Sequence, residues 1–146
     1  MVVIAKSRSM GADADRVWDI LVDWENERKY WTNERDIKVV RSDETTIERE
    51  ATVGPRGFAQ KTKQKIVLDP KKSIKLSLQG DHLNGERTIS LSPASETTTR
   101  LDVAWNLQMS DVPGFVEGIV KSQISKVTED ALKRISEAAQ QSMRDL

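Results

Sequence analysis

Polar and apolar residues alternate on one side of three segments that have the period of β-strands. The polar members are Arg49, Gln60, Thr62, Gln64 and Arg87, and they share that side with Ile47, Phe58, Ile66 and Ile89. Because burying an unpartnered charge or amide costs free energy, these groups need polar partners, water or a ligand. The pattern therefore predicts a concave surface that recognises polar groups of a bound molecule. Two other interpretations stay open: both arginines extend past strand ends into solvent, or a β-bulge reverses the two faces.

The sequence offers little for metal, nucleophilic or phosphate-loop chemistry. It has no cysteine, and its one histidine, His82, falls in a predicted turn without a second ligand at helical spacing. Residues 54–57 and 80–85 contain glycines, but they join strands to strands, whereas a phosphate loop joins a strand to a helix. We therefore expect no metal and no cofactor, and we assign no catalytic residue.

A series of predicted strands positions the polar residues. Alternation with a period of two recurs in six segments between residues 35 and 109, and turn-forming residues interrupt it at 54–57, 69–72, 80–85 and 92–96. The last segment has the clearest apolar stripe, formed by Leu101, Val103, Trp105, Leu107 and Met109. Six strands joined by short turns predict an antiparallel meander.

Helices are predicted before and after this meander in the sequence. Asp13 can cap a first helix in which Val17, Leu21 and Trp24 share one face, and residues 25–32 form a short second helix. A third helix of roughly 30 residues, about 45 Å long, follows Asp111 and Pro113. Its apolar stripe consists of Val116, Val120, Ile124, Val127, Ala131, Ile135 and Ala138, widened by Phe115, Ile119 and Leu132.

The first helix and the strand before it resemble the entry of the START-like proteins, through Ala12, Val17, Trp18, Leu21 and Asp23. This superfamily, also called SRPBCC or helix-grip, includes the birch pollen allergen, coenzyme-Q-binding proteins and polyketide cyclases. The resemblance is nearest the polyketide cyclase and coenzyme-Q-binding branch, through Gly80, Gly85 and residues 91–93 and 97–103. It implies an α+β helix-grip fold, in which a strongly curved antiparallel sheet wraps around the C-terminal helix and encloses a cavity.

Length and charge narrow the function further. The chain has 146 residues, and we expect residues 1–146 to form a single ligand-binding domain. Its 23 basic and 23 acidic residues cancel, which argues against nucleic acid as a partner. The apolar run at the N-terminus is too short for a signal peptide, and no segment approaches the roughly 20 apolar residues of a membrane span. We expect a cytoplasmic protein without stable membrane insertion.

The leading hypothesis is a non-enzymatic carrier of a hydrophobic or amphipathic small molecule, such as a lipid, an isoprenoid quinone or a polyketide-like aromatic. The alternative is a cyclase, dehydratase or hydrolase, but arginine is too basic to exchange protons readily and the sequence reveals no inward carboxylate. A third possibility is a chaperone co-factor-like module with an unspecified protein partner. Charged outward residues, Glu48, Glu50, Lys61, Lys63 and Lys65, disfavour it.

The predicted ligand-binding residues lie on the strands and on the start of the last helix. They are Arg49, Phe58, Gln60, Gln64, Leu76, Leu78, Arg87, Ile89, Val103, Trp105, Phe115, Ile119 and Gln123. The START-like resemblance also implies that loops line the cavity mouth, through Arg56, Phe58, His82 and Leu83.

Overall fold

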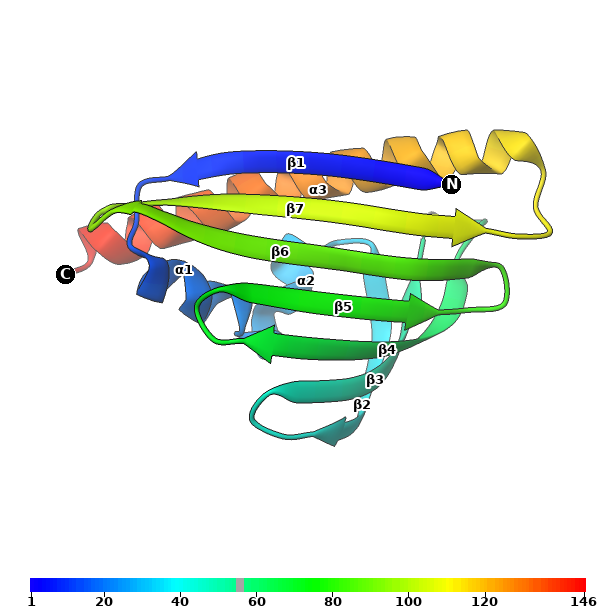
Figure 1. The fold of residues 1–146 in the computed structure, drawn as a ribbon, viewed down its shortest axis with the longest axis horizontal. Coiled ribbons are helices and arrows are strands. Elements are labelled where there is room, and N and C mark those ends of the chain that lie inside the picture. Colours follow the sequence, from blue (N-terminus) through cyan, green and yellow to red (C-terminus); the bar gives the residue numbers. More distant parts are fainter. Residues whose placement is uncertain (55–56) are drawn as a thin grey trace.

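The computed structural model describes residues 1–54 and 57–146, and in it helices cover one face of a seven-stranded antiparallel sheet (Figure 1). The elements in chain order are β1 (Val2–Met10), α1 (Ala14–Leu21), η1 (Trp24–Asn26), α2 (Glu27–Tyr30), β2 (Glu34–Ser42), β3 (Thr46–Val53), β4 (Gln60–Asp69), β5 (Ser73–Gln79), β6 (Leu83–Ser95), β7 (Thr98–Met109) and α3 (Gly114–Arg144). The predicted order of one strand, two helices, six strands and a long helix is confirmed. The second helix is shorter than predicted and begins with the 3-10 turn η1.

The six consecutive strands β2 to β7 form the predicted meander, and β1 adds to its far side by pairing with β7. The sheet stays open, with β1 and β2 as its edges. Gly85, predicted to end a turn, instead pairs with Leu107 inside the β6–β7 ladder. A Cβ at Gly85 would lie 2.1 Å from the carbonyl oxygen of Asn106, so the close approach of these two strands requires glycine.

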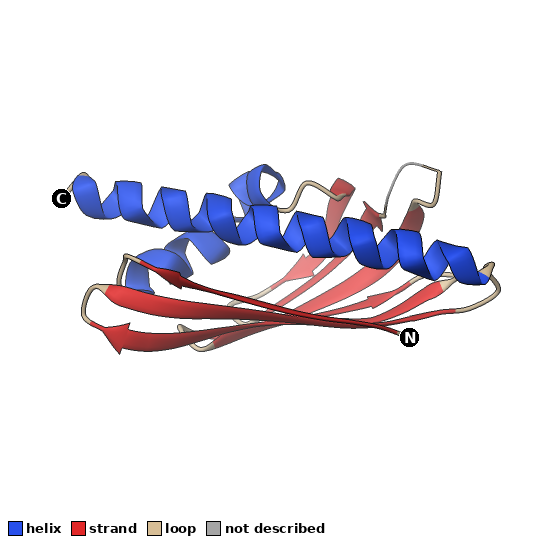
Figure 2. Cartoon of the chain, turned by 90° about the horizontal axis from the view of Figure 1, so that it is seen from above, coloured by secondary structure: helices blue, strands red, loops and turns tan. Residues whose placement is uncertain are grey.

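The long helix α3 lies across one face of the sheet, and α1 and α2 lie on that same side (Figure 2). Its buried stripe includes Val120, Ile124 and Ile135, which pack against apolar residues of the strands. The prediction that Phe115 and Ile119 widen this stripe is wrong, because they are 66% and 40% exposed. Near the other end, Ala139 is buried rather than Ala138.

Two local predictions fail for reasons that the geometry shows. Asp13 occupies the N-cap position of α1, but its carboxylate accepts a hydrogen bond from Arg16 at 2.8 Å instead of capping the backbone. The alternation of Ile37 and Val39 in the sequence predicts a buried position for Val39, yet it is 55% exposed. Its strand, β2, is an edge strand whose register shifts on both sides of Lys38 and Val39, and such shifts break the alternation. Among the described residues, no helix is long and apolar enough to cross a membrane.

Candidate functional site

Four charged residues meet in the interior, between the sheet and the short helix α2. Arg49 of β3 and Arg87 of β6 both point inward and are 3% and 2% exposed, so the interpretation that they extend into solvent is wrong. Glu27 of α2 and Glu34, the first residue of β2, are equally buried. We call Glu27, Glu34, Arg49 and Arg87 the ionic cluster. It joins α2 to three strands of the sheet.

Each nitrogen of the Arg49 guanidinium group donates a hydrogen bond. Its Nη1 and Nη2 donate to the two carboxylate oxygens of Glu27 at 2.5 and 2.8 Å, and Nη2 also donates to Glu34 at 3.2 Å. Its Nε donates to Oε1 of Gln64 at 2.8 Å, and the amide of Gln64 donates to Thr62. This fork-to-carboxylate geometry fixes Arg49 rigidly. Arg49 is therefore the structural centre of the cluster. Gln64, which also lines the cavity, is hydrogen-bonded to it.

Arg87 is held mainly by aromatic faces. Its guanidinium carbon lies 4.2 Å from the ring centre of Trp31 and 5.4 Å from that of Trp105, and these two rings pack edge to face. Its Nη1 lies 3.6 Å from Glu34, beyond hydrogen-bonding distance. Nε and Nη1 of Arg87 have no hydrogen-bond partner among the described residues. Arg87 thus keeps a buried charge with free donors.

The two carboxyl groups of the cluster differ in acidity. Burial raises the pKa of Glu34 to about 8, helped by the negative charge of Glu27 and a hydrogen bond between the two side chains, and the arginines only partly oppose this. Burial also acts to raise the pKa of Glu27, but hydrogen bonds from Arg49 and Glu34 outweigh it and leave that pKa below its usual value. At neutral pH, Glu34 is therefore mostly protonated beside an ionised Glu27.

The sequence analysis missed both carboxylates. Glu27 lies in a helix of four residues, too short for a clear periodic pattern, and Glu34 begins a strand whose alternation is broken. A signal was nevertheless present, because two inward arginines require acidic partners. A search for glutamates on the segments facing those strands would have found them.

A cavity lies between the sheet and α3, beside the cluster. Six of the predicted binding residues line it, namely Phe58, Gln60, Gln64, Leu76, Leu78 and Trp105. Asn33, Glu34, Val120 and Ile124, which were not predicted as binding residues, also line it. The cavity has a volume of about 20 Å³, enough for one or two water molecules. The cavity is therefore nearly closed in this structure, and a larger molecule enters only if its lining moves apart.

The other predicted site residues lie elsewhere. Arg87 and Ile89 border a separate space of about 10 Å³ under α1 and α2, and Val103 is buried in the core. Phe115, Ile119 and Gln123 line a groove on the outer flank of α3. Of the residues implied for the mouth, Leu83 lines the cavity, His82 is exposed, and Arg56 lies outside the described residues.

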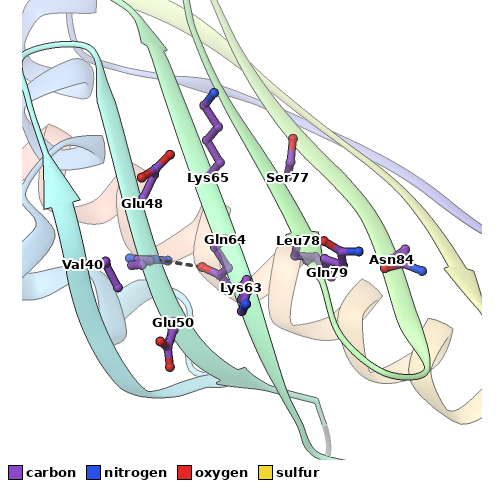
Figure 3. Close-up of a pocket in the computed structure, with 11 residues that line it drawn as sticks. Val40, Glu48, Glu50, Lys63, Gln64, Lys65, Ser77, Leu78, Gln79 and Asn84 are labelled. Carbon is purple, nitrogen blue, oxygen red and sulfur yellow. Dashed lines mark hydrogen bonds between the residues drawn. The ribbon is translucent and has the colours of Figure 1, made fainter.

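A further hollow of about 720 Å³ lies over the outer side of the sheet, from β2 to β6 (Figure 3). In the strand register Glu48 faces Lys65 and Glu50 faces Lys63, so opposite charges are neighbours across the strands. This arrangement is typical of a solvated sheet surface. Within the described part of the chain, no three acidic or histidine side chains are grouped to hold a metal ion.

Trp105 connects the cavity lining to α3. Its indole Nε1 donates to Oγ1 of Thr128 at 3.0 Å, and that hydroxyl donates to the carbonyl of Ile124 at 2.7 Å. Thr128→Val should therefore lower the free energy of unfolding by about 1–3 kcal/mol, because it leaves a buried N–H unpaired. Thr128→Ser, which keeps the hydroxyl, is the control in urea denaturation. A Thr128→Val variant as stable as Thr128→Ser, or more stable, would show that this hydrogen bond contributes little to stability.

An open, curved antiparallel sheet covered by a long C-terminal helix defines the START-like fold. Solved structures share it over nearly the whole chain. A protein from Thermus thermophilus has a TM-score of 0.79 at 18% identity, covering 96% of this chain and 98% of that one. A START superfamily protein from Mycobacterium smegmatis has a TM-score of 0.73 at 17% identity, covering 92% and 97%.

The Zhui aromatase/cyclase from a Streptomyces species has a TM-score of 0.66 at 15% identity, covering 93% of this chain and 87% of that one. No curated protein matches the sequence. The profile of the family described as polyketide cyclase / dehydrase and lipid transport matches residues 1–140. The chain belongs to this family.

Proposed function

We propose that this protein binds a hydrophobic or amphipathic small molecule between the sheet and α3, in the class of lipids, isoprenoid quinones and polyketide-like aromatics. The observation that carries the proposal is the composition of the cavity. Leu76, Leu78, Trp105, Val120 and Ile124 supply apolar surface, whereas Asn33, Glu34 and Gln64 supply polar groups at a few positions. Such a lining suits a ligand with an apolar body and a polar end.

The ionic cluster would recognise the polar end. Glu34 lines the cavity, and the unpartnered Nη1 of Arg87 lies 3.6 Å from its Oε1. A carbonyl or phenolate oxygen that enters beside Glu34 would accept a hydrogen bond from this nitrogen. Protonation of Glu34 also leaves the two arginines with only one ionised carboxylate, so the cluster carries net positive charge at neutral pH. That charge favours a ligand with a carbonyl or an anionic group.

Tryptophan fluorescence tests this proposal, because Trp31 and Trp105 flank Arg87. Titration with a fatty acid, a short-chain quinone and a hydroxylated polycyclic aromatic should show saturable binding of at least one of them. Arg87→Leu should weaken that binding about tenfold while leaving the circular dichroism spectrum unchanged, as expected for a lost hydrogen bond to charge. If the variant bound every probe as tightly as the wild type, Arg87 would not belong to the site.

A second candidate function is proton transfer on the bound molecule, as in a cyclase or dehydratase. Glu34 favours it, because a carboxyl group with a pKa of about 8 beside the cavity can act as a general acid or base near neutral pH. With a polyketide-like substrate, Glu34→Gln would abolish turnover but preserve binding if Glu34 moves the proton. If the variant turned the substrate over as fast as the wild type, Glu34 would not transfer the proton, and only the carrier function would remain.

A further inference from the structure

The groove outside α3 has the features of a second part of the ligand site. It is lined by Thr32, Phe115, Gly118, Ile119, Ser122, Gln123, Lys126, Val127 and Asp130, and it offers about 740 Å³ of open space. The inner cavity, with about 20 Å³, holds no molecule of the proposed class without expansion. The groove is thus the larger ready-made space on the helix side of the sheet.

Groove and cavity lie on opposite sides of the same two segments. Thr32 lines the groove and its neighbour Asn33 lines the cavity. Along α3, Ile119 and Gln123 line the groove, whereas the residues that follow them, Val120 and Ile124, line the cavity. A molecule that separated α3 from the segment before β2 would therefore contact both spaces at once.

The groove is apolar at one end, and a buried hydrogen-bond acceptor lies in one of its lining residues, Gln123. Phe115 and Ile119, which lie one helical turn apart, expose 66% and 40% of their surface and form a small apolar patch at that end. The Oε1 atom of Gln123 is buried but has no partner among the residues that the structure describes, and the same holds for Oδ1 of Asn33 on the cavity side. Buried amide oxygens nearly always accept hydrogen bonds, so both atoms call for a donor.

We infer that the groove binds the outer part of the ligand, with an apolar ring or chain on Phe115 and Ile119 and a hydroxyl or amino group that donates to Gln123. This inference rests on the proposed function and narrows its ligand class to amphipathic molecules that carry a hydrogen-bond donor. A ligand with acceptors alone would leave the amide oxygen unpaired and bind less tightly.

Gly118 provides a variant that fills the groove without disturbing the core. A Cβ at Gly118 meets nothing within 4 Å, and the same is true of Gly114, which does not line the groove. Gly118→Leu should weaken binding of 2-naphthol at least tenfold, whereas the matched control Gly114→Leu should bind it like the wild type. Both variants should fold, since leucine is the better helix former.

The hydroxyl group can be tested separately. The wild type should bind 2-naphthol about tenfold more tightly than 2-methoxynaphthalene, which lacks the donor, and Gln123→Leu should remove this preference. Equal binding by Gly118→Leu and Gly114→Leu, or a preference that survives Gln123→Leu, would overturn the groove site. If Arg87-dependent binding persisted in that case, the proposed function would stand. If the wild type bound neither naphthalene nor any fluorescence-titration probe, both proposals would fall.

Discussion

Arg49→Met is expected to lower the free energy of unfolding by about 3–5 kcal/mol, because it removes the partner of a buried carboxylate. Glu27 would lose both guanidinium hydrogen bonds, and Gln64 would lose the donor that holds its amide oxygen. Urea denaturation at pH 7 measures the loss. Arg41→Met, on an exposed position of the edge strand β2, is the matched control and should change stability by less than about 0.5 kcal/mol.

A double-mutant cycle identifies the cause. Replacing Glu27 by glutamine in the Arg49→Met background removes the stranded charge, so the double variant should be more stable than Arg49→Met alone. A loss for Arg49→Met no larger than that for Arg41→Met would contradict the ionic cluster as a major determinant of stability.

Glu34→Gln should stabilise the protein increasingly as the pH rises from about 4.5 to 8. In the folded state the pKa of Glu34 is about 8, against 4.5 for an ordinary glutamate, so the folded protein holds a proton that the unfolded chain has released. The stability that this proton provides is complete below pH 4.5 and is lost as the pH rises to 8. The slope is about 1.4 kcal/mol per pH unit, and the total is about 4–5 kcal/mol.

The measurement is the difference in unfolding free energy between Glu34→Gln and wild type at pH 5, 6, 7 and 8. Glu50→Gln, at an exposed position of the same sheet, should run parallel to the wild type. Glu27 acts in the opposite sense: its pKa is lowered, so its contribution is present above pH 4.5 and declines only in acid. A constant difference between Glu34→Gln and wild type across this range would show that Glu34 is ionised throughout.

The order of strands and helices could be predicted because each signal is local. The stripe from Leu101 to Met109 alternates without interruption, and the last helix repeats apolar residues over many turns. The inward side of Arg49 and Arg87 followed from the same alternation. Edge strand β2 was harder, because its register shifts place Val39 in solvent.

The site required contacts that no periodic pattern contains. Glu27 and Arg49 are 22 residues apart in sequence, and Glu34 and Arg49 are 15 apart, so the cluster exists only after α2 packs against the sheet. Phe115 and Ile119 lie next to the residues of the apolar stripe of α3 in the sequence, yet both are exposed near the start of this helix. The groove they line is therefore a property of the assembled fold.

Native mass spectrometry tests the central claim, that a small molecule binds between the sheet and α3. The freshly purified protein is measured before and after incubation with an organic extract of cells, beside Val120→Phe, which places a larger side chain in the cavity. The account predicts one bound molecule per wild-type chain, released by organic solvent and identifiable as a lipid, quinone or aromatic, and little or none in the variant. A wild-type protein that stays empty in the extract, or an adduct equally abundant in Val120→Phe, would contradict it.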